Sequence, residues 1–207
     1  ATDDNNTWVG YLSGSAANGA SAGGNTGVGS NSLSSLTTGI YNTAIGYQSL
    51  ASQTTLSESV AVGAYAGTTT TARVTAIGGY ALQNNSTGID NTAVGYGAMT
   101  ANTSGLSNTA VGVTAGNAQA GATDDNNTWV GYRAGKVANG SASGLNTAVG
   151  SQSGKVISTG AGNTLVGASS GPSLTTGTDN TILGRASGST ITTGISNTNI
   201  GSYTNYL

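Results

Sequence analysis

The chain has 207 residues, of which 35 are glycine and only 6% are charged, with a formal net charge of −2. The absence of cysteine excludes disulfides, thiolate catalysis and Cys-type metal sites. The five basic residues are scattered, so no nucleic-acid-binding patch is present. No apolar run approaches the roughly 18–20 residues of a membrane span.

One short phrase recurs along the whole chain, and it is clearest at 91–96, Asn-Thr-Ala-Val-Gly-Tyr. Successive closing glycines are 19, 17, 17, 15, 17, 17, 19, 19, 17, 17 and 17 residues apart. Because all these intervals are odd, each copy keeps the same alternation of side chains in a strand. A disordered Gly- and Ser-rich linker would not keep this register. The twelve glycines are Gly10, Gly29, Gly46, Gly63, Gly78, Gly95, Gly112, Gly131, Gly150, Gly167, Gly184 and Gly201.

Each copy of the phrase predicts one short strand that ends just before the glycine. In the copy at 91–96, Thr92 and Val94 share one face of the strand and Ala93 lies on the other. Both faces are mostly apolar, as in strands that are covered on both sides. We expect Val94 to belong to a thin core and Ala93 to face a neighbouring chain. Each coil has room for one further short strand, and no helical periodicity occurs.

Two other features recur with the phrase. Thr-Thr-Gly groups at 37–39, 175–177 and 192–194 lie seven residues before the closing glycine and predict a turn, with Gly permitting positive φ. Asparagine stands four residues before the closing glycine in ten copies, which predicts a ladder of side-chain amides. The predicted structural ladder comprises Asn42, Asn91, Asn108, Asn146, Asn163, Asn180, Val94, Val111, Val149, Val166, Gly95, Gly112, Gly150 and Gly167.

These repeats predict an all-β fold, a parallel β-solenoid or β-roll of about twelve coils of 15–19 residues. At about 4.8 Å per strand step, the rod would be roughly 50–55 Å long. We expect residues 1–207 to form a single solenoid domain. Residues 1–11 recur unchanged at 122–132, so a 121-residue super-repeat divides the chain into 1–121 and 122–207. The chain is therefore expected to be a segment of a longer array or the product of a duplication.

The sequence 42–50, Asn-Thr-Ala-Ile-Gly-Tyr-Gln-Ser-Leu, resembles repeats of bacteriophage-type tail-fibre proteins that end in a self-cleaving chaperone domain. The phrase is also similar to Ser-Val-Ala-Ile-Gly repeats in the head domains of trimeric autotransporter adhesins. The resemblance implies a left-handed β-roll, three chains around one axis, and a fibre on a cell surface or virion. This chain departs from the adhesin pattern in its longer coils and in having Thr in place of the first Val.

No catalytic, cofactor-binding or metal-binding constellation is predicted, because there is no His or Cys and the carboxylates are few. The pairs Asp3-Asp4 and Asp124-Asp125 offer oxygen ligands for Ca²⁺. Adjacent residues of an extended segment point apart, however, so a solvated loop is favoured. The remaining carboxylates are Glu58, Asp90 and Asp179.

Tyrosine and threonine each recur at coil spacing. An exposed tyrosine row would bind glycans or pack chains together, and packing is favoured; its members would be Tyr11, Tyr47, Tyr65, Tyr80, Tyr96, Tyr132, Tyr203 and Tyr206. Recurrent threonine also raises the possibility of ice binding. Thr92 shares its face with Val94, which argues against this for the phrase, so the Thr-Thr-Gly groups are the better candidates.

We therefore expect a non-enzymatic extracellular fibre protein, an adhesin or tail-fibre shaft, that forms a rigid rod for attachment and needs no cofactor. The expected partners are copies of the chain, as a trimer or a head-to-tail filament, and cell-surface or matrix glycans or proteins. Neither nucleic acid nor membrane insertion is expected. The alternative is a structural subunit of an extracellular filament or sheath that assembles end to end, and ice-binding or glycan-binding functions are less favoured.

Overall fold

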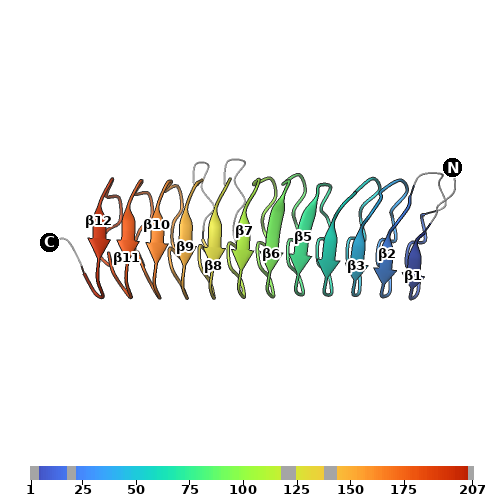
Figure 1. Cartoon of the computed structure of the whole chain (residues 1–207), viewed down its shortest axis with the longest axis horizontal. Coiled ribbons are helices and arrows are strands. Elements are labelled where there is room, and N and C mark those ends of the chain that lie inside the picture. Colours follow the sequence, from blue (N-terminus) through green and yellow to red (C-terminus); the bar gives the residue numbers. More distant parts are fainter. Residues whose placement is uncertain (1–4, 18–21, 118–124, 138–143, 205–207) are drawn as a thin grey trace.

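The computed structural model describes residues 5–17, 22–117, 125–137 and 144–204. Twelve short strands pair in parallel, in chain order, into one sheet, and Figure 1 shows them side by side along the long axis of a rod. This confirms the predicted all-β parallel solenoid. The described ranges contain no helix that could span a membrane. The strands are β1 (Thr7–Val9), β2 (Thr26–Val28), β3 (Thr43–Ile45), β4 (Val60–Val62), β5 (Val74–Ile77), β6 (Asn91–Val94), β7 (Thr109–Val111), β8 (Thr128–Val130), β9 (Thr147–Val149), β10 (Thr164–Val166), β11 (Thr181–Leu183) and β12 (Thr198–Ile200).

Equivalent positions of successive copies pair with one another. Thr164 pairs with Thr181, and Val166 pairs with Leu183. The sequence left room for a second short strand in each coil, but no such strand forms in the described residues. Outside the twelve strands, they contain only one isolated parallel bridge, between Thr178 and Ile195. The second residue after every closing glycine has positive φ, as at Tyr80, where φ is 60°. Such left-handed residues turn the chain and prevent a second extended segment.

The strand faces point the opposite way from the prediction. Ala93 is fully buried, whereas Val111 and Val149 are 37% and 36% exposed. Val94 and Val166 are half-buried, so the assignment of the valines to the core and of Ala93 to an outer surface was wrong. The interior is narrow because ten of the twelve coils, all but the first and the last, also bury a small residue three positions after the closing glycine, such as Ala98. A narrow interior suits alanine at the strand centre and leaves the branched residues outside.

In several coils the core exchanges bulk between two positions, the strand centre and the residue six positions later. Where the strand centre is large, as at Trp129, the residue six positions later is glycine, Gly135. Where the strand centre is Ala93, the residue six positions later is Met99, which is fully buried. A Cβ atom on Gly135 would lie 2.3 Å from the Trp129 ring, so the two positions share one space.

The asparagines form a buried ladder that joins successive coils, except where Ser59 and Val74 replace asparagine. The Oδ1 atom of Asn146 accepts hydrogen bonds from the backbone N of Asn163 at 3.1 Å and from its Nδ2 at 3.0 Å. The same Nδ2 donates to the carbonyl of Gly177 at 2.8 Å, in the following coil. Each internal amide therefore satisfies backbone groups that would otherwise be buried without partners. Asn25, Asn42, Asn91, Asn108, Asn127, Asn146, Asn163, Asn180 and Asn197 make ladder bonds of this kind.

The glycines of the Thr-Thr-Gly turns have a different role from the one predicted. The φ angle of Gly177 lies outside the left-handed region, so positive φ does not explain the residue. A Cβ atom there would lie 2.4 Å from the carbonyl oxygen of Gly194, which means that close approach of successive coils requires glycine. The closing glycines, in contrast, do have positive φ, which is 134° at Gly95.

Candidate functional site

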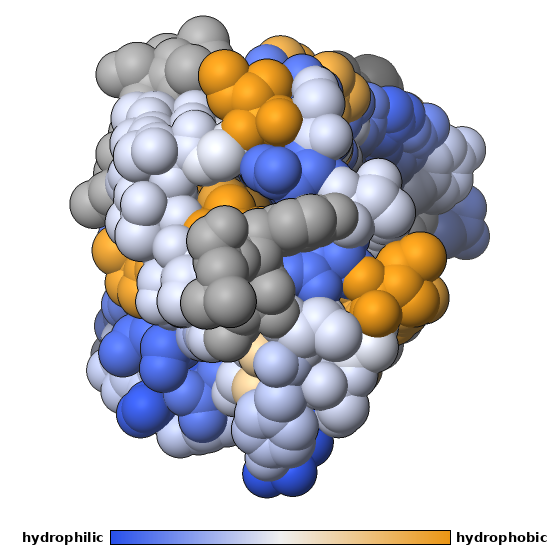
Figure 2. Space-filling model, turned by 90° about the vertical axis from the view of Figure 1, so that its left-hand side faces the viewer, coloured by the Kyte–Doolittle hydropathy of each residue, from blue (hydrophilic) through white to orange (hydrophobic). Residues whose placement is uncertain are grey.

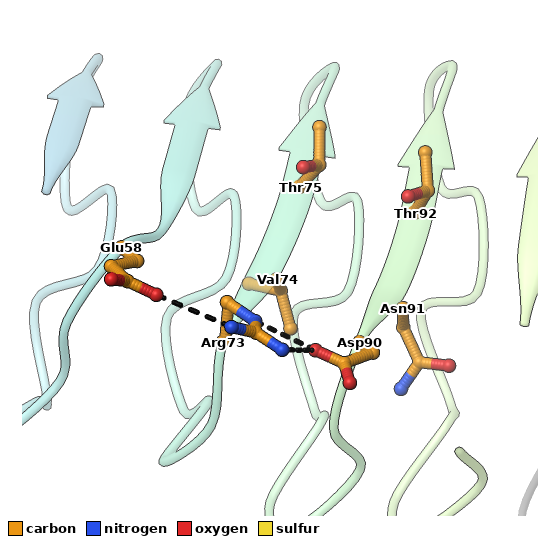
Figure 3. A pocket seen from close by; sticks show the side chains of 7 residues that line it. All are labelled: Glu58, Arg73, Val74, Thr75, Asp90, Asn91 and Thr92. Atoms are coloured by element: carbon orange, nitrogen blue, oxygen red, sulfur yellow. Dashed lines mark hydrogen bonds and ion pairs between the residues drawn. The ribbon is translucent and has the colours of Figure 1, made fainter. Parts of the chain in front are cut away.

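Three of the described charged side chains, Glu58, Arg73 and Asp90, gather at one place, where β4, β5 and β6 begin. The guanidinium of Arg73 lies between Glu58 and Asp90, which come from the two neighbouring coils (Figure 3). Its Nη1 is 3.2 Å from Oε2 of Glu58, and its Nε donates to Oδ1 of Asp90 at 2.7 Å. The hydrogen bonds to Asp90 and then Glu58 raise the pKa of Arg73. All three side chains are about half exposed, so solvent screens their attraction.

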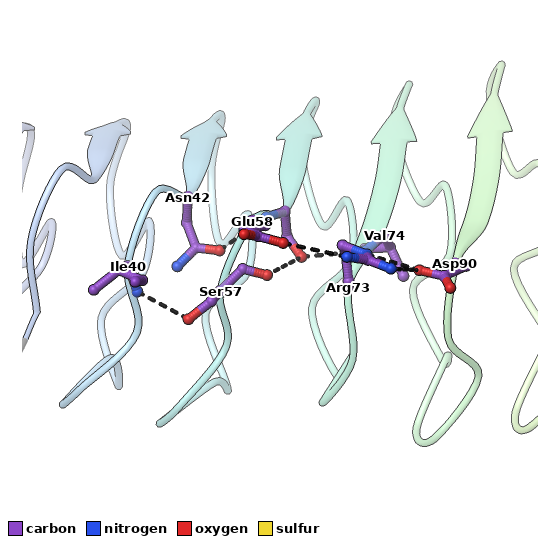
Figure 4. Close-up of polar contacts among 8 residues, drawn as sticks. Ile40, Asn42, Ser57, Glu58, Arg73, Val74 and Asp90 are labelled. Atoms are coloured by element: carbon purple, nitrogen blue, oxygen red, sulfur yellow. Dashed lines mark hydrogen bonds and ion pairs between the residues drawn. The ribbon is translucent and has the colours of Figure 1, made fainter.

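This ion triad lies where the asparagine ladder is interrupted. Ser59 and Val74 occupy the ladder positions of the coils that carry Glu58 and Arg73. The backbone N of Ser59 donates to Oδ1 of Asn42, and the backbone N of Val74 donates to Oγ of Ser59 (Figure 4). The valine side chain has no polar group, so the ladder of side-chain hydrogen bonds stops at Val74. The ion triad therefore links the three coils at the surface at the point where the interior amide link is missing.

Local backbone geometry explains the position of Arg73. The twelve residues that directly precede the ladder positions are all described, and among them Arg73 alone has no positive φ. Its coil is also the shortest, with 15 residues between Gly63 and Gly78. The shorter turn enters β5 without a left-handed residue, and the guanidinium of Arg73 reaches both neighbouring coils.

A shallow pocket of about 210 Å³ lies beside the ion triad (Figure 3). Its charged groups are two carboxylates and one guanidinium, and both carboxylates are already bonded to Arg73. The lining residues are Glu58, Arg73, Val74, Thr75, Asp90, Asn91 and Thr92.

A column of polar side chains is buried in the same coils. Nδ2 of Asn85 donates to Oγ1 of Thr70 at 3.0 Å, and Nδ2 of Asn102 donates to Oδ1 of Asn85 at 2.6 Å. Nδ2 of Asn91 also lies 3.3 Å from Oδ1 of Asn85, which connects this column to the ladder. Sequence reasoning missed the column, although a signal was available, since the equivalent position is aliphatic in several other coils, as at Ile157 and Leu174.

Four tyrosines form a row at the opposite ends of the same strands. Tyr47 and Tyr65 meet edge to face with centroids 5.3 Å apart, Tyr65 and Tyr80 stack at 5.1 Å, and Tyr80 and Tyr96 meet at 5.6 Å. Burial, followed by the neighbouring Tyr47, raises the pKa of Tyr65. Only Tyr65 and Tyr80 share a ring face, whereas the end members of the row, Tyr47 and Tyr96, stay 44% and 59% exposed.

The remaining tyrosines do not join this row. Arg133 covers the ring of Tyr132 at 4.9 Å, and Arg185 covers that of Tyr203 at 5.1 Å. Tyr11 is highly exposed, and Tyr206 lies outside the described residues. The predicted continuous tyrosine row is therefore confined to four coils.

The proposed calcium pairs lie mostly outside the described residues, because Asp3, Asp4 and Asp124 are not among them. Asp125 is described, and its Oδ1 accepts a hydrogen bond from the backbone N of Leu106 at 2.7 Å. Within the described ranges, no group of three or more acidic, His or Cys side chains is arranged to hold a metal ion.

Comparisons of this chain with models of known protein families, with curated proteins and with solved structures find no match. The similarity to tail-fibre and autotransporter repeats therefore stays a resemblance between short motifs. Left-handedness and the trimer, which that resemblance implies, likewise stay predictions.

Proposed function

We propose that this chain is a rigid, non-catalytic shaft of an extracellular fibre, of the adhesin or tail-fibre kind. The observation that carries the proposal is the continuity of hydrogen bonding between coils. Strand pairing joins every coil to the next, and the asparagine ladder adds a second line of buried bonds. Since each coil buries little apolar surface by itself, its stability depends on its neighbours, as in other solenoids.

A shaft must transmit force along its length without local collapse. The turn threonines support this role, because Oγ1 of Thr37 donates to the carbonyl of Thr54 at 2.8 Å and thus adds another bond between coils. Hydrogen bonds such as this one join successive coils and point along the axis of the rod. A pull on the two ends loads many of them together, so we expect resistance to stretching.

Single-molecule force measurements test this proposal. The chain is held at its two ends and pulled, and we expect unfolding at high force, with extensions that are multiples of one coil. A control in which Asn163→Ala weakens one link should unfold at lower force, starting from the same length. Coil-by-coil extension at forces close to those of an unfolded polymer would contradict a shaft function.

A second candidate, an end-to-end filament subunit, has its own support. The outward residues of β1 and β12 are equivalent, Thr7 with Thr198 and Val9 with Ile200, and the outer edge of each strand has no strand partner among the described residues. An unpaired edge can pair with another chain. Electron microscopy of native material separates the two candidates. Long uniform filaments favour the subunit, whereas short rods joined to other domains favour the shaft.

A further inference from the structure

The outward face of the sheet consists of two parallel rows. The first is a row of threonines, one from each strand except β4, where Val60 takes the place, and the second is a row of branched aliphatic residues. None of the twelve strands contains a charged residue. The aliphatic row is partly exposed along its length, from Val9 at 55% to Ile200 at 63%. This outward face, the Thr/Val face, is therefore long, neutral and only moderately polar.

Most hydroxyls on the Thr/Val face are not used by other described residues of the chain. Thr198 apart, the strand threonines make no side-chain hydrogen bond within the described residues. Threonines in the turns behave differently. Oγ1 of Thr69 donates to the carbonyl of Gln83 at 2.7 Å, and Oγ1 of Thr100 donates to the carbonyl of Tyr80 at 3.0 Å. The Thr/Val face thus presents a regular set of hydroxyls that are available to something outside the chain.

The spacing of the Thr/Val face is set by the sheet. Strands in register place successive threonines about 4.8 Å apart along the rod, and the two rows lie roughly 6.6 Å apart, because two residues separate them along the strand. Figure 1 shows no progressive rotation of the strands from β1 to β12, so the rows stay straight. Both spacings are close to repeats of the lattice of hexagonal ice. We propose that the Thr/Val face binds ice.

The chemistry of the face favours ice over a protein partner. Interfaces between proteins are anchored by aromatic and arginine side chains that fill pockets, and neither row contains them. Threonine methyls and valine side chains instead form a smooth surface that orders water, while the hydroxyls anchor it. The ion triad lies where β4 to β6 begin, and Thr75 and Thr92 of the Thr/Val face also line the pocket beside it; the tyrosine row lies at the opposite ends of the strands.

Apolar residues also reach the surface elsewhere, but not as a comparable array. Figure 2, a view along the rod from the β12 end, shows hydrophobic residues in several separate places around the coil. In two of the Thr-Thr-Gly turns, which the sequence favoured as the ice-binding row, the first hydroxyl is used internally: Oγ1 of Thr175 donates to the carbonyl of Thr192 at 3.2 Å, and Oγ1 of Thr37 donates to that of Thr54 at 2.8 Å. The Thr/Val face is therefore the better candidate.

Thermal hysteresis and incorporation into a growing ice hemisphere, both measured on the full chain, test the proposal. We expect clear hysteresis and faceted crystals from the wild type. In Thr109→Tyr, a ring would stand above the middle of the Thr/Val face, and hysteresis should fall several-fold. The matched control is Thr55→Tyr, on an exposed turn away from the strands, which should keep full activity. Circular dichroism checks that both variants fold.

Three results would overturn the proposal. The first is wild-type hysteresis no greater than that of an unrelated protein at the same concentration, which needs no variant at all. The second is equal activity of folded Thr109→Tyr and wild type. The third is a wild-type dimer in sedimentation that Thr109→Tyr converts to a monomer, since the face would then be an interface between copies. The inference concerns the face of a single chain and does not depend on the shaft function.

Discussion

The ring of Trp129 occupies the space that a side chain on Gly135 would need. A Cβ atom on Gly135 would lie 2.3 Å from the ring, and the φ angle there is +57°, which already disfavours other residues. Trp8 and Gly14 stand in the same relation in the first coil, where a Cβ atom on Gly14 would also lie 2.3 Å from the ring of Trp8. The large residue is accommodated because its own coil supplies the gap.

Gly135→Ala should destabilise the chain through both effects. We expect a loss of about 2–4 kcal/mol, from overpacking against Trp129 and from the left-handed backbone. Gly97→Ala is the control, because its φ is +61° but the nearest atom to its Cβ would be 3.3 Å away. It should lose only about 1 kcal/mol in urea unfolding. Equal losses for the two variants would show that the ring does not limit the site.

Exchanging the bulk between the two positions should restore part of the stability. Trp129→Ala alone should cost about 3–5 kcal/mol, because it empties a fully buried site. Adding Gly135→Leu reproduces the pattern of Ala44 and Leu50, in which Leu50 is fully buried with φ of 49°. We expect the double variant to be more stable than the sum of the single changes by about 1–3 kcal/mol. Additive losses would contradict exchange of volume within one coil.

The asparagine ladder should be sensitive to loss of one amide. Asn163→Ala leaves the carbonyl of Gly177 and Oδ1 of Asn146 with fewer partners, and each buried unsatisfied group costs about 1–3 kcal/mol. Native-state hydrogen exchange should show faster exchange at the coils on either side, whereas distant coils keep their protection. Substitution of the exposed Asn84 to Ala is the control, with a change within about 0.5 kcal/mol.

The ion triad should contribute in a salt-dependent way. Arg73→Gln removes the contacts to both Glu58 and Asp90, and we expect faster amide exchange in β4 to β6 at low ionic strength. Because the three side chains are about half exposed, the difference between variant and wild type should shrink as salt is added. A difference that is independent of salt would indicate a packing role for the arginine stem instead.

Alkaline pH should weaken the tyrosine row. The pKa of Tyr65 is raised above its ordinary value of 10.0 by burial and by Tyr47, so the folded state favours the neutral phenol. The stability that neutral Tyr65 contributes is fully present below the pKa of this tyrosine in the unfolded chain. It is lost as the pH rises through the pKa of Tyr65 in the folded chain. Denaturant unfolding at a series of pH values should therefore show stability falling above about pH 10. Tyr65→Phe should flatten this dependence, and an unchanged slope would contradict it.

The architecture could be predicted from the sequence because one phrase returns at odd intervals. Odd spacing preserves the alternation of side chains, so pairing of Thr43 with Thr26 follows from the repeat alone. The direction of the faces could not be predicted in the same way, since both faces of the phrase are apolar. The width of the interior decides it, and that width depends on turn residues such as Met99 and Ala98 that fill the opposite wall.

The candidate site was harder to predict because its residues are far apart in the chain. Glu58, Arg73 and Asp90 are separated by 15 and 17 residues, and each reads as an isolated charge. They meet because all three directly precede a ladder position. Aligning the coils on their closing glycines would have placed them in one column. Arg73 lacks the positive φ of the equivalent residues in the other coils, and no sequence pattern indicates this difference.

The uniformity of the ladder has a consequence for inheritance. Asn127 bonds to Asn108 across 19 residues, and Asn163 bonds to Asn146 across 17, with the same atoms and nearly the same distances. A whole coil can therefore be gained or lost by unequal recombination, and the two new neighbours still find matching partners. Selection can tune the reach of such a protein by copying or deleting short stretches of DNA, without solving a new folding problem each time.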